Sequence, residues 1–151
     1  MREAGPQGTA EYMLYQNKTS AQPCVIILDD DDLVGAGIAL LARDAGYDAA
    51  IFKSLSHATA EMESISVQAI ISDFDLGNGP NGVEAARALR AHRFPAPPVL
   101  IVTAMRRRSV ETAAREAGFE VLSKPASPAS LKRWLARNAP RPASLFEANR
   151  P

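Results

Sequence analysis

The chain has 151 residues, of which 46% are hydrophobic and 23% charged, and its formal net charge is zero. This length suits one domain with its own core and leaves no room for a second domain of useful size, and the composition argues against a wholly disordered chain. No apolar run approaches the length of a membrane span, and the N-terminus lacks the basic and apolar regions of a signal peptide, so we expect a cytoplasmic protein. The one cysteine, Cys24, lies in an apolar run and is expected to be a buried structural thiol.

Positive and negative charges are unevenly distributed along the chain. Residues 1–105 carry 7 basic and 13 acidic side chains, whereas residues 106–151 carry 10 basic and 4 acidic ones. Solvated helix faces explain most such imbalances, and a docking surface for an acidic partner is the alternative. No aromatic residues are interleaved with Arg106, Arg107 and Arg108, which disfavours nucleic-acid binding.

Apolar runs of strand length alternate with segments of helical period between Cys24 and Asn138. Before them, residues 1–23 show no sustained period and are predicted to be a flexible leader or linker, with a turn of helix at residues 12–15 as a minor alternative. Strands are expected at residues 24–28, 47–52, 68–73, 98–103 and 119–122, and helices at 33–45, 54–65, 82–93, 109–117 and 127–138, followed by a polar tail over residues 139–151. With short loops and right-handed crossovers, this alternation predicts an α/β fold, a doubly wound five-stranded parallel sheet with helices on both faces.

The stretch from Gln68 to Gly82, QAIISDFDLGNGPNG, is the centre of the functional prediction. Its apolar run indicates a buried strand that delivers Asp73 and Asp75 into a loop at the sheet's carboxyl edge, where ligands bind in open α/β sheets. An aspartate at this place is often only a helix cap or a turn residue. A second acidic group, DDDD at residues 29–32, follows the run CVIIL, and one or two of these acids would be enough to cap the next helix. Crowded carboxylates repel one another unless a cation lies between them, so we expect a cation here.

Two further strands end on polar groups. Thr103 closes the run PVLIVT, and Lys124 follows the last strand beside a proline. Either residue alone is unremarkable at a strand end, but we expect all these groups at one edge of the sheet: Asp29, Asp30, Asp73, Asp75, Thr103 and Lys124. The acids suit Mg²⁺, a hard ion that shares phosphate oxygens. Thr103 and Lys124 are then donors to phosphoryl oxygens, and Asp73 is a candidate nucleophile for phosphoryl transfer.

Four motifs in this order resemble the receiver domain of two-component response regulators, from about Cys24 to Asn138. They are DDD after the first strand, ISD at the third, VTA at the fourth and SKP after the fifth. The stretch GFEVLSKPASPASLKRWL further resembles receivers attached to hybrid histidine kinases. The resemblance implies the flavodoxin-like strand order 2-1-3-4-5 and a signalling phosphoacceptor rather than an enzyme. Asp73 would take a phosphoryl group from the phosphohistidine of a sensor kinase or of a histidine phosphotransfer protein.

The resemblance also implies the remaining roles at the site. Asp30 and Asp73 would bind Mg²⁺ directly, Asp29 mainly through water, and the main-chain carbonyl of Asp75 would complete the protein's ligands. Thr103 and Lys124 would bind the phosphoryl oxygens, with a cis peptide at Lys124–Pro125. With no DNA-binding domain expected and no membrane segment, the output would be contact with a downstream protein, onward phosphotransfer, or a homodimer through the last helices.

Two departures from the family pattern concern signal output and phosphoryl lifetime. Receivers usually carry an aromatic residue three positions before the lysine, where this chain has Val121, so the usual aromatic relay is not implied. The two positions that tune dephosphorylation are Asp75 and Met105 here, and we do not expect either to orient an attacking water well.

Two other interpretations compete with a working receiver. One is a receiver fold used as a scaffold that is never phosphorylated, since fold does not guarantee chemistry. The other is a haloacid dehalogenase-type Mg²⁺ phosphatase, because Asp73-Phe74-Asp75 resembles that class's DxD motif. In that class the motif ends the first strand, whereas here another strand precedes it, and no cap domain is expected.

Overall fold

The computed structural model describes residues 24–91, 93–105 and 107–139. The predicted leader at residues 1–23 and nearly all of the predicted polar tail lie outside the described residues. In chain order the described elements are β1 (Cys24–Leu28), α2 (Asp32–Asp44), β2 (Asp48–Phe52), α3 (Leu55–Glu61), the 3₁₀ turn η1 (Met62–Ser64), β3 (Val67–Asp73), α4 (Gly82–Arg90), β4 (Val99–Thr103), α5 (Arg108–Glu116), β5 (Glu120–Ser123) and α6 (Pro128–Asn138).

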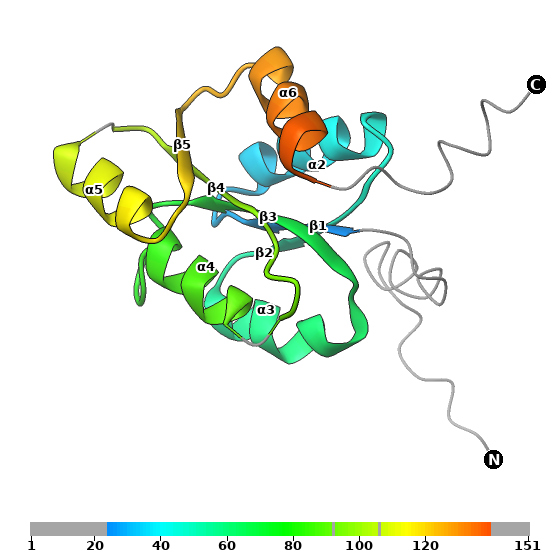
Figure 1. The fold of residues 1–151 in the computed structure, drawn as a ribbon, viewed down its shortest axis with the longest axis horizontal. Helices are drawn as coiled ribbons and strands as arrows, with labels where there is room; N and C mark the ends of the chain where they lie inside the picture. The colour runs from blue at the N-terminus through cyan, green and yellow to red at the C-terminus, as the bar shows by residue number, and fades with distance from the viewer. Residues whose placement is uncertain (1–23, 92, 106, 140–151) are drawn as a thin grey trace, which may run out of the picture.

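The five strands form one sheet in the order β2-β1-β3-β4-β5, and every neighbouring pair is parallel. Helices α2 and α6 cover one face of this sheet, and α3, α4 and α5 cover the other (Figure 1). The predicted fold class and strand order are therefore confirmed. Among the described residues, no helix is both long and apolar enough to cross a lipid bilayer.

The strand assignments follow from burial on both faces. All five residues of β1 and all five of β4 are buried, as the continuous apolar runs CVIIL and VLIVT predict for strands covered by helices on both sides. Alternate residues serve separate cores. Cys24, Ile26 and Leu28 pack with α3, α4 and α5, whereas Val25 and Ile27 pack with α2 and α6. The expectation of a buried thiol at Cys24 is confirmed.

Two helices end three or more residues earlier than the sequence pattern predicts. The helix expected over residues 54–65 stops at Glu61 and continues as the η1 turn, where the hydroxyl of Ser64 donates to the Glu61 carbonyl at 3.2 Å. The helix expected over residues 82–93 stops at Arg90. The Arg93 guanidinium donates to the carbonyls of Met62 and Ile65, so its backbone belongs to a loop pinned against the end of η1.

Candidate functional site

Three aspartates meet where β1 and β3 end. Leu28 and Ser72 are register partners on these neighbouring strands, so Asp29 and Asp73, one residue further along each chain, arrive side by side. Carboxylate oxygens of Asp29, Asp30 and Asp73 lie within 4.8 Å of one another. Asp29 and Asp73 are buried and Asp30 is exposed, so the cluster lies at the surface with its inner part shielded from water.

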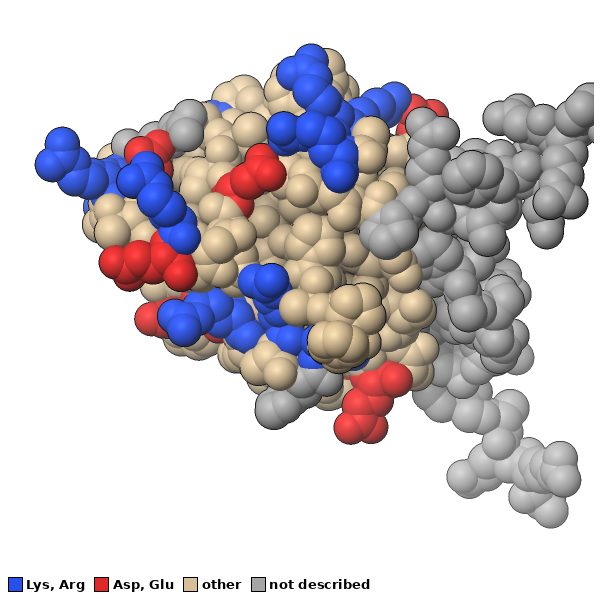
Figure 2. Space-filling view, in the orientation of Figure 1, with Lys and Arg blue, Asp and Glu red and all other residues tan. Residues whose placement is uncertain are grey.

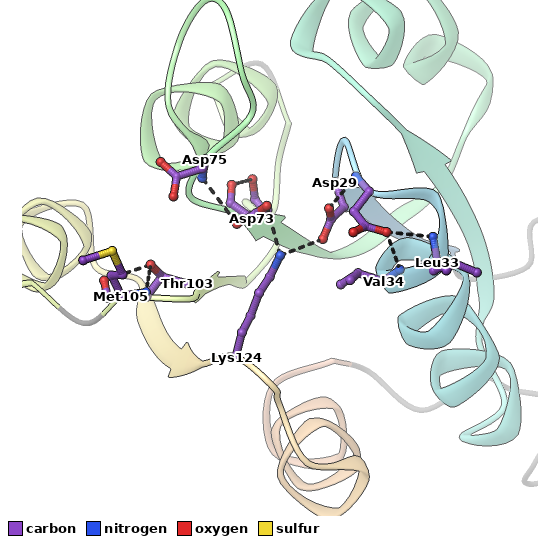
Figure 3. Close-up of polar contacts among 10 residues, drawn as sticks. Asp29, Leu33, Val34, Asp73, Asp75, Thr103, Met105 and Lys124 are labelled. Carbon is purple, nitrogen blue, oxygen red and sulfur yellow. Dashed lines mark hydrogen bonds and ion pairs between the residues drawn. The ribbon is translucent and has the colours of Figure 1, made fainter.

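Lys124 reaches this cluster from the end of β5, the strand at the edge of the sheet. Its backbone N–H donates to the carbonyl of Thr103 at 2.7 Å, which anchors the end of β5 against β4. From there its ammonium nitrogen extends to 3.0 Å from Asp73 Oδ2 and 3.3 Å from Asp29 Oδ2 (Figure 3). One half-buried cation thus bridges two buried carboxylates that would otherwise repel each other.

The environment shifts the pKa of both partners. Burial raises the pKa of the Asp73 carboxyl above its usual 3.8, the Asp29 charge adds to this, and the hydrogen bond and charge of Lys124 oppose it. Burial lowers the pKa of the Lys124 ammonium, but the hydrogen bonds and charges of Asp73 and Asp29 outweigh burial and raise this pKa above 10.5. Lys124 is therefore a cation throughout the neutral range.

The four consecutive aspartates divide into two pairs. Asp31 is the N-cap of α2, and its carboxylate accepts from the backbone N–H groups of Leu33 and Val34 at 3.0 and 3.2 Å. Asp32 lies in the first helical turn and pairs with Lys53 at the surface. Capping and surface pairing account for these two acids, which leaves the pair at residues 29 and 30 for the cluster.

Asp75 and Thr103 face away from the centre of the cluster. The Asp75 carboxylate is exposed and points away from Asp73, whereas its backbone N–H donates to Asp73 Oδ1 at 3.3 Å (Figure 3). The buried Thr103 hydroxyl donates to the Met105 carbonyl at 3.0 Å and accepts from the Met105 N–H at 3.2 Å. The structure therefore brings Asp29, Asp30, Asp73 and Lys124 together, with Thr103 on the next strand and its hydroxyl turned into its own loop.

Residues 25–136 of the chain match the family profile described as the response regulator receiver domain. The chain belongs to this family.

Solved structures share the fold. The chemotaxis protein CheY4 of Vibrio cholerae superposes with a TM-score of 0.70 at 24% identity, over 78% of this chain and 99% of that one. A protein from Chloroflexus aurantiacus J-10-fl, described as a candidate response regulator, gives 0.68 at 30% identity, over 77% and 96%. The beryllofluoride-activated NtrC4 receiver domain dimer gives 0.68 at 19% identity, over 76% and 93%. The likeness covers nearly the whole of each of these chains.

Two further features of this receiver domain bear on the sequence predictions. The Lys124–Pro125 peptide is cis, as the family resemblance implied, and Phe94–Pro95 is also cis, which the sequence did not suggest. Val121 is partly buried and packs against the core under α3, α4 and α5, so a small aliphatic side chain occupies the place where receivers usually carry an aromatic ring.

Two residues that contact the Asp73 backbone could not be identified as functional from the sequence. The hydroxyl of Ser72 is fully buried and donates to the Asp73 carbonyl at 3.0 Å. The first residue of α4, Gly82, comes so close that an added Cβ would stand 1.9 Å from the same oxygen. A serine within a strand and a glycine at a helix start are both ordinary, and only the three-dimensional contact distinguishes them.

Proposed function

We propose that this receiver domain accepts a phosphoryl group on Asp73 from the phosphohistidine of a sensor histidine kinase or of a histidine phosphotransfer protein. The observation that carries the proposal is the setting of the Asp73 carboxylate. It belongs to the buried part of an acidic cluster, 3.0 Å from the Lys124 ammonium group, at the carboxyl edge where ligands reach a doubly wound sheet. Such positioning and charge neutralisation are the main requirements for phosphoryl transfer.

In the proposed step, a carboxylate oxygen of Asp73 attacks phosphorus as the P–N bond to imidazole breaks. The electron pair of that bond goes to the imidazole, which takes up a proton, and an acyl phosphate remains on Asp73. Lys124 already touches this carboxylate and would follow the new negative charge onto a phosphoryl oxygen. Thr103 would donate its hydroxyl to another phosphoryl oxygen after releasing the Met105 carbonyl.

The donor set of the cluster fits Mg²⁺. Three carboxylates, one of them exposed, provide hard oxygen ligands and leave coordination positions for water and phosphate oxygens. We assign direct ligation to Asp30 and Asp73, ligation through water to Asp29, and the remaining protein ligand to the main-chain carbonyl of Asp75. When bound, the ion would neutralise negative charge on the transferring group.

The position of Asp75 favours a phosphoacceptor over a phosphatase. A phosphatase of the haloacid dehalogenase type would need the second aspartate of its DxD motif as a general acid beside the first. Here that carboxylate is exposed and directed away from Asp73 (Figure 3).

Output would pass through protein contacts of the later elements. Lys and Arg side chains lie over α5 and α6 with acidic side chains between them (Figure 2). Arg108, Arg115 and Arg133 are exposed, and Arg137 pairs with Glu120 of β5. We propose this face as the contact for an acidic downstream partner or for a second copy of the chain. One structural neighbour, the NtrC4 receiver, is described as a dimer. Phosphorylation would shift the loop after Thr103, which leads into α5.

The test is intact-mass measurement of the full chain after incubation with Mg²⁺ and acetyl phosphate, beside Asp73→Asn. We expect one added phosphoryl group in the wild type and none in the variant, with Asp73→Asn retaining the wild-type fold by circular dichroism. Uptake by folded Asp73→Asn would contradict the assignment. A folded wild type that neither binds Mg²⁺ nor gains mass would favour an unphosphorylated scaffold.

A further inference from the structure

The peptide unit between Asp73 and Phe74 is held at both ends. On one side, the Phe74 N–H donates to the Val102 carbonyl of β4 at 3.0 Å. On the other, the Asp73 carbonyl accepts from the Ser72 hydroxyl at 3.0 Å. The Asp73 side chain branches from the Cα atom at the start of this peptide unit. The orientation of the peptide unit therefore limits where the Asp73 carboxylate can point.

The start of α4 closes over the same carbonyl. A Cβ on Gly82 would stand 1.9 Å from the Asp73 oxygen and 2.7 Å from its carbonyl carbon, whereas carbon and oxygen atoms ordinarily meet at roughly 3.3 Å or more. The Gly82 N–H also donates to the Phe74 carbonyl at 2.7 Å. Both partners in this contact are backbone, so neither can yield by changing a side-chain rotamer.

The helix start that makes this contact is itself fixed. Asn81 and Glu84 form a reciprocal capping box, in which the Glu84 N–H donates to Asn81 Oδ1 at 3.0 Å and the Asn81 N–H to Glu84 Oε2 at 3.2 Å. The capping box therefore fixes the position of Gly82 relative to the Asp73 carbonyl.

We propose that Ser72 and Gly82 are positioning residues for phosphorylation of Asp73. They hold the Asp73–Phe74 peptide so that the carboxylate faces Lys124 and the acids of the cluster. This inference rests on the proposed phosphoacceptor function and adds to it two residues that act through the backbone of Asp73. A side chain at residue 82 would shift either α4 or the Asp73–Phe74 peptide by about 1 Å. Misplacement of reacting groups by that distance lowers a reaction rate on the order of 10²-fold.

The test compares Ser72→Ala and Gly82→Ala with Gly37→Ala in the full chain. Gly37 is an exposed glycine of α2 whose added Cβ would meet no atom within 4 Å, so it controls for the substitution itself. Phosphorylation is followed by mass at saturating Mg²⁺ over a range of acetyl phosphate concentrations. The temperature is one at which the fluorescence of Trp134 shows that each variant is folded. We expect the maximal rate constant to fall roughly tenfold in Ser72→Ala and about 10²-fold in Gly82→Ala, with the half-saturating acetyl phosphate concentration unchanged and Gly37→Ala equal to wild type.

A merely structural role would lower the melting temperature of Ser72→Ala and leave the maximal rate constant of the folded protein intact. That result overturns the proposal, whether or not Gly82→Ala folds. It is distinct from failure of the proposed function, in which the wild type itself would take up no phosphoryl group.

Discussion

Replacing Lys124 by methionine tests whether its charge, rather than its packing, holds the acidic cluster together. Methionine keeps an unbranched apolar side chain of similar length and removes the ammonium that lies 3.0 Å from Asp73 and 3.3 Å from Asp29. The Asp29 side chain is 1% exposed and that of Asp73 8%, so solvent screens the remaining carboxylates poorly. The variant therefore leaves two neighbouring carboxylates without their shared cation.

Removing one partner of a buried ion pair costs about 3 to 5 kcal/mol, and we take the lower end because the ammonium itself is partly solvated. Unfolding entropy of about 2.1 cal/mol/K per residue gives about 0.24 kcal/mol/K for a domain of roughly 115 residues. A loss of about 3 kcal/mol then lowers the melting temperature by about 12 °C.

The pH dependence of this loss has a definite sign. Without Lys124, the contribution that lowers the Asp73 pKa is gone, so this pKa rises further above 3.8 in the folded state. Between 3.8 and the raised value the folded protein binds more protons than the unfolded chain, and its stability therefore falls as pH rises. The deficit of Lys124→Met relative to wild type should be greatest at neutral pH and shrink on acidification.

Mg²⁺ should restore the stability of the variant, because a divalent ion can replace the missing cation between the carboxylates. At 100 times its dissociation constant, a ligand that binds only the folded state stabilises it by about 2.7 kcal/mol. The assay is thermal unfolding followed by Trp134, the chain's one tryptophan, which is buried in the core under α6. Lys132→Met is the control, since the Lys132–Asp44 pair lies at the surface, and we expect no resolvable change. A deficit in Lys124→Met that is independent of both pH and Mg²⁺ would refute the reasoning.

Two further predictions concern the binding of Mg²⁺. Asp30→Asn should weaken Mg²⁺ binding at least tenfold, as measured by calorimetry. Asp32→Asn is the control, because Asp32 lies outside the cluster and pairs with Lys53, and it should bind Mg²⁺ as wild type does. Equal affinities in both variants would remove Asp30 from the ligand set. Because burial raises the pKa of Asp73, protons should compete with Mg²⁺ for this carboxylate at pH values above 3.8. The dissociation constant for Mg²⁺ should therefore rise as pH falls from neutrality. An affinity that stays constant down to pH 4 would count against Asp73 as a ligand.

The sheet could be predicted because its signals are local and strong. The run CVIIL, and the run VLIVT up to its final threonine, are continuously apolar over the length of one strand, which favours a strand covered on both faces, and both proved fully buried. Helix ends were less predictable. The apolar period of the segment at residues 54–65 continues past Glu61, but the backbone tightens there into the η1 turn, and the pattern does not record that change.

The acidic cluster could be located in the sequence because strand ends at one edge of a parallel sheet must meet. The sequence could not show how far Lys124 reaches, since that depends on the β5 backbone being tied to Thr103. Nor could it show the close approach of Gly82 to the Asp73 carbonyl, because that contact joins a helix start and a strand end through a turn whose geometry the residue types leave open. Distances between backbone segments are set by packing. A glycine or serine in the sequence is compatible with a close backbone contact but does not predict one.

The run of four aspartates shows how a structural cap and a chemical site can share one short segment. The cap at Asp31 fixes the start of α2 by accepting from two of its free N–H groups. The Asp31 N–H in turn donates to Asp29 Oδ1 at 2.9 Å, so the residue that caps the helix also orients the buried carboxylate behind it. The other oxygen of Asp29 faces Lys124. Each oxygen of this buried acid thus has a donor, one from the backbone of the cap and one from Lys124 at the end of β5, so a charged group is buried beside Asp73 with neither oxygen lacking a hydrogen-bond partner.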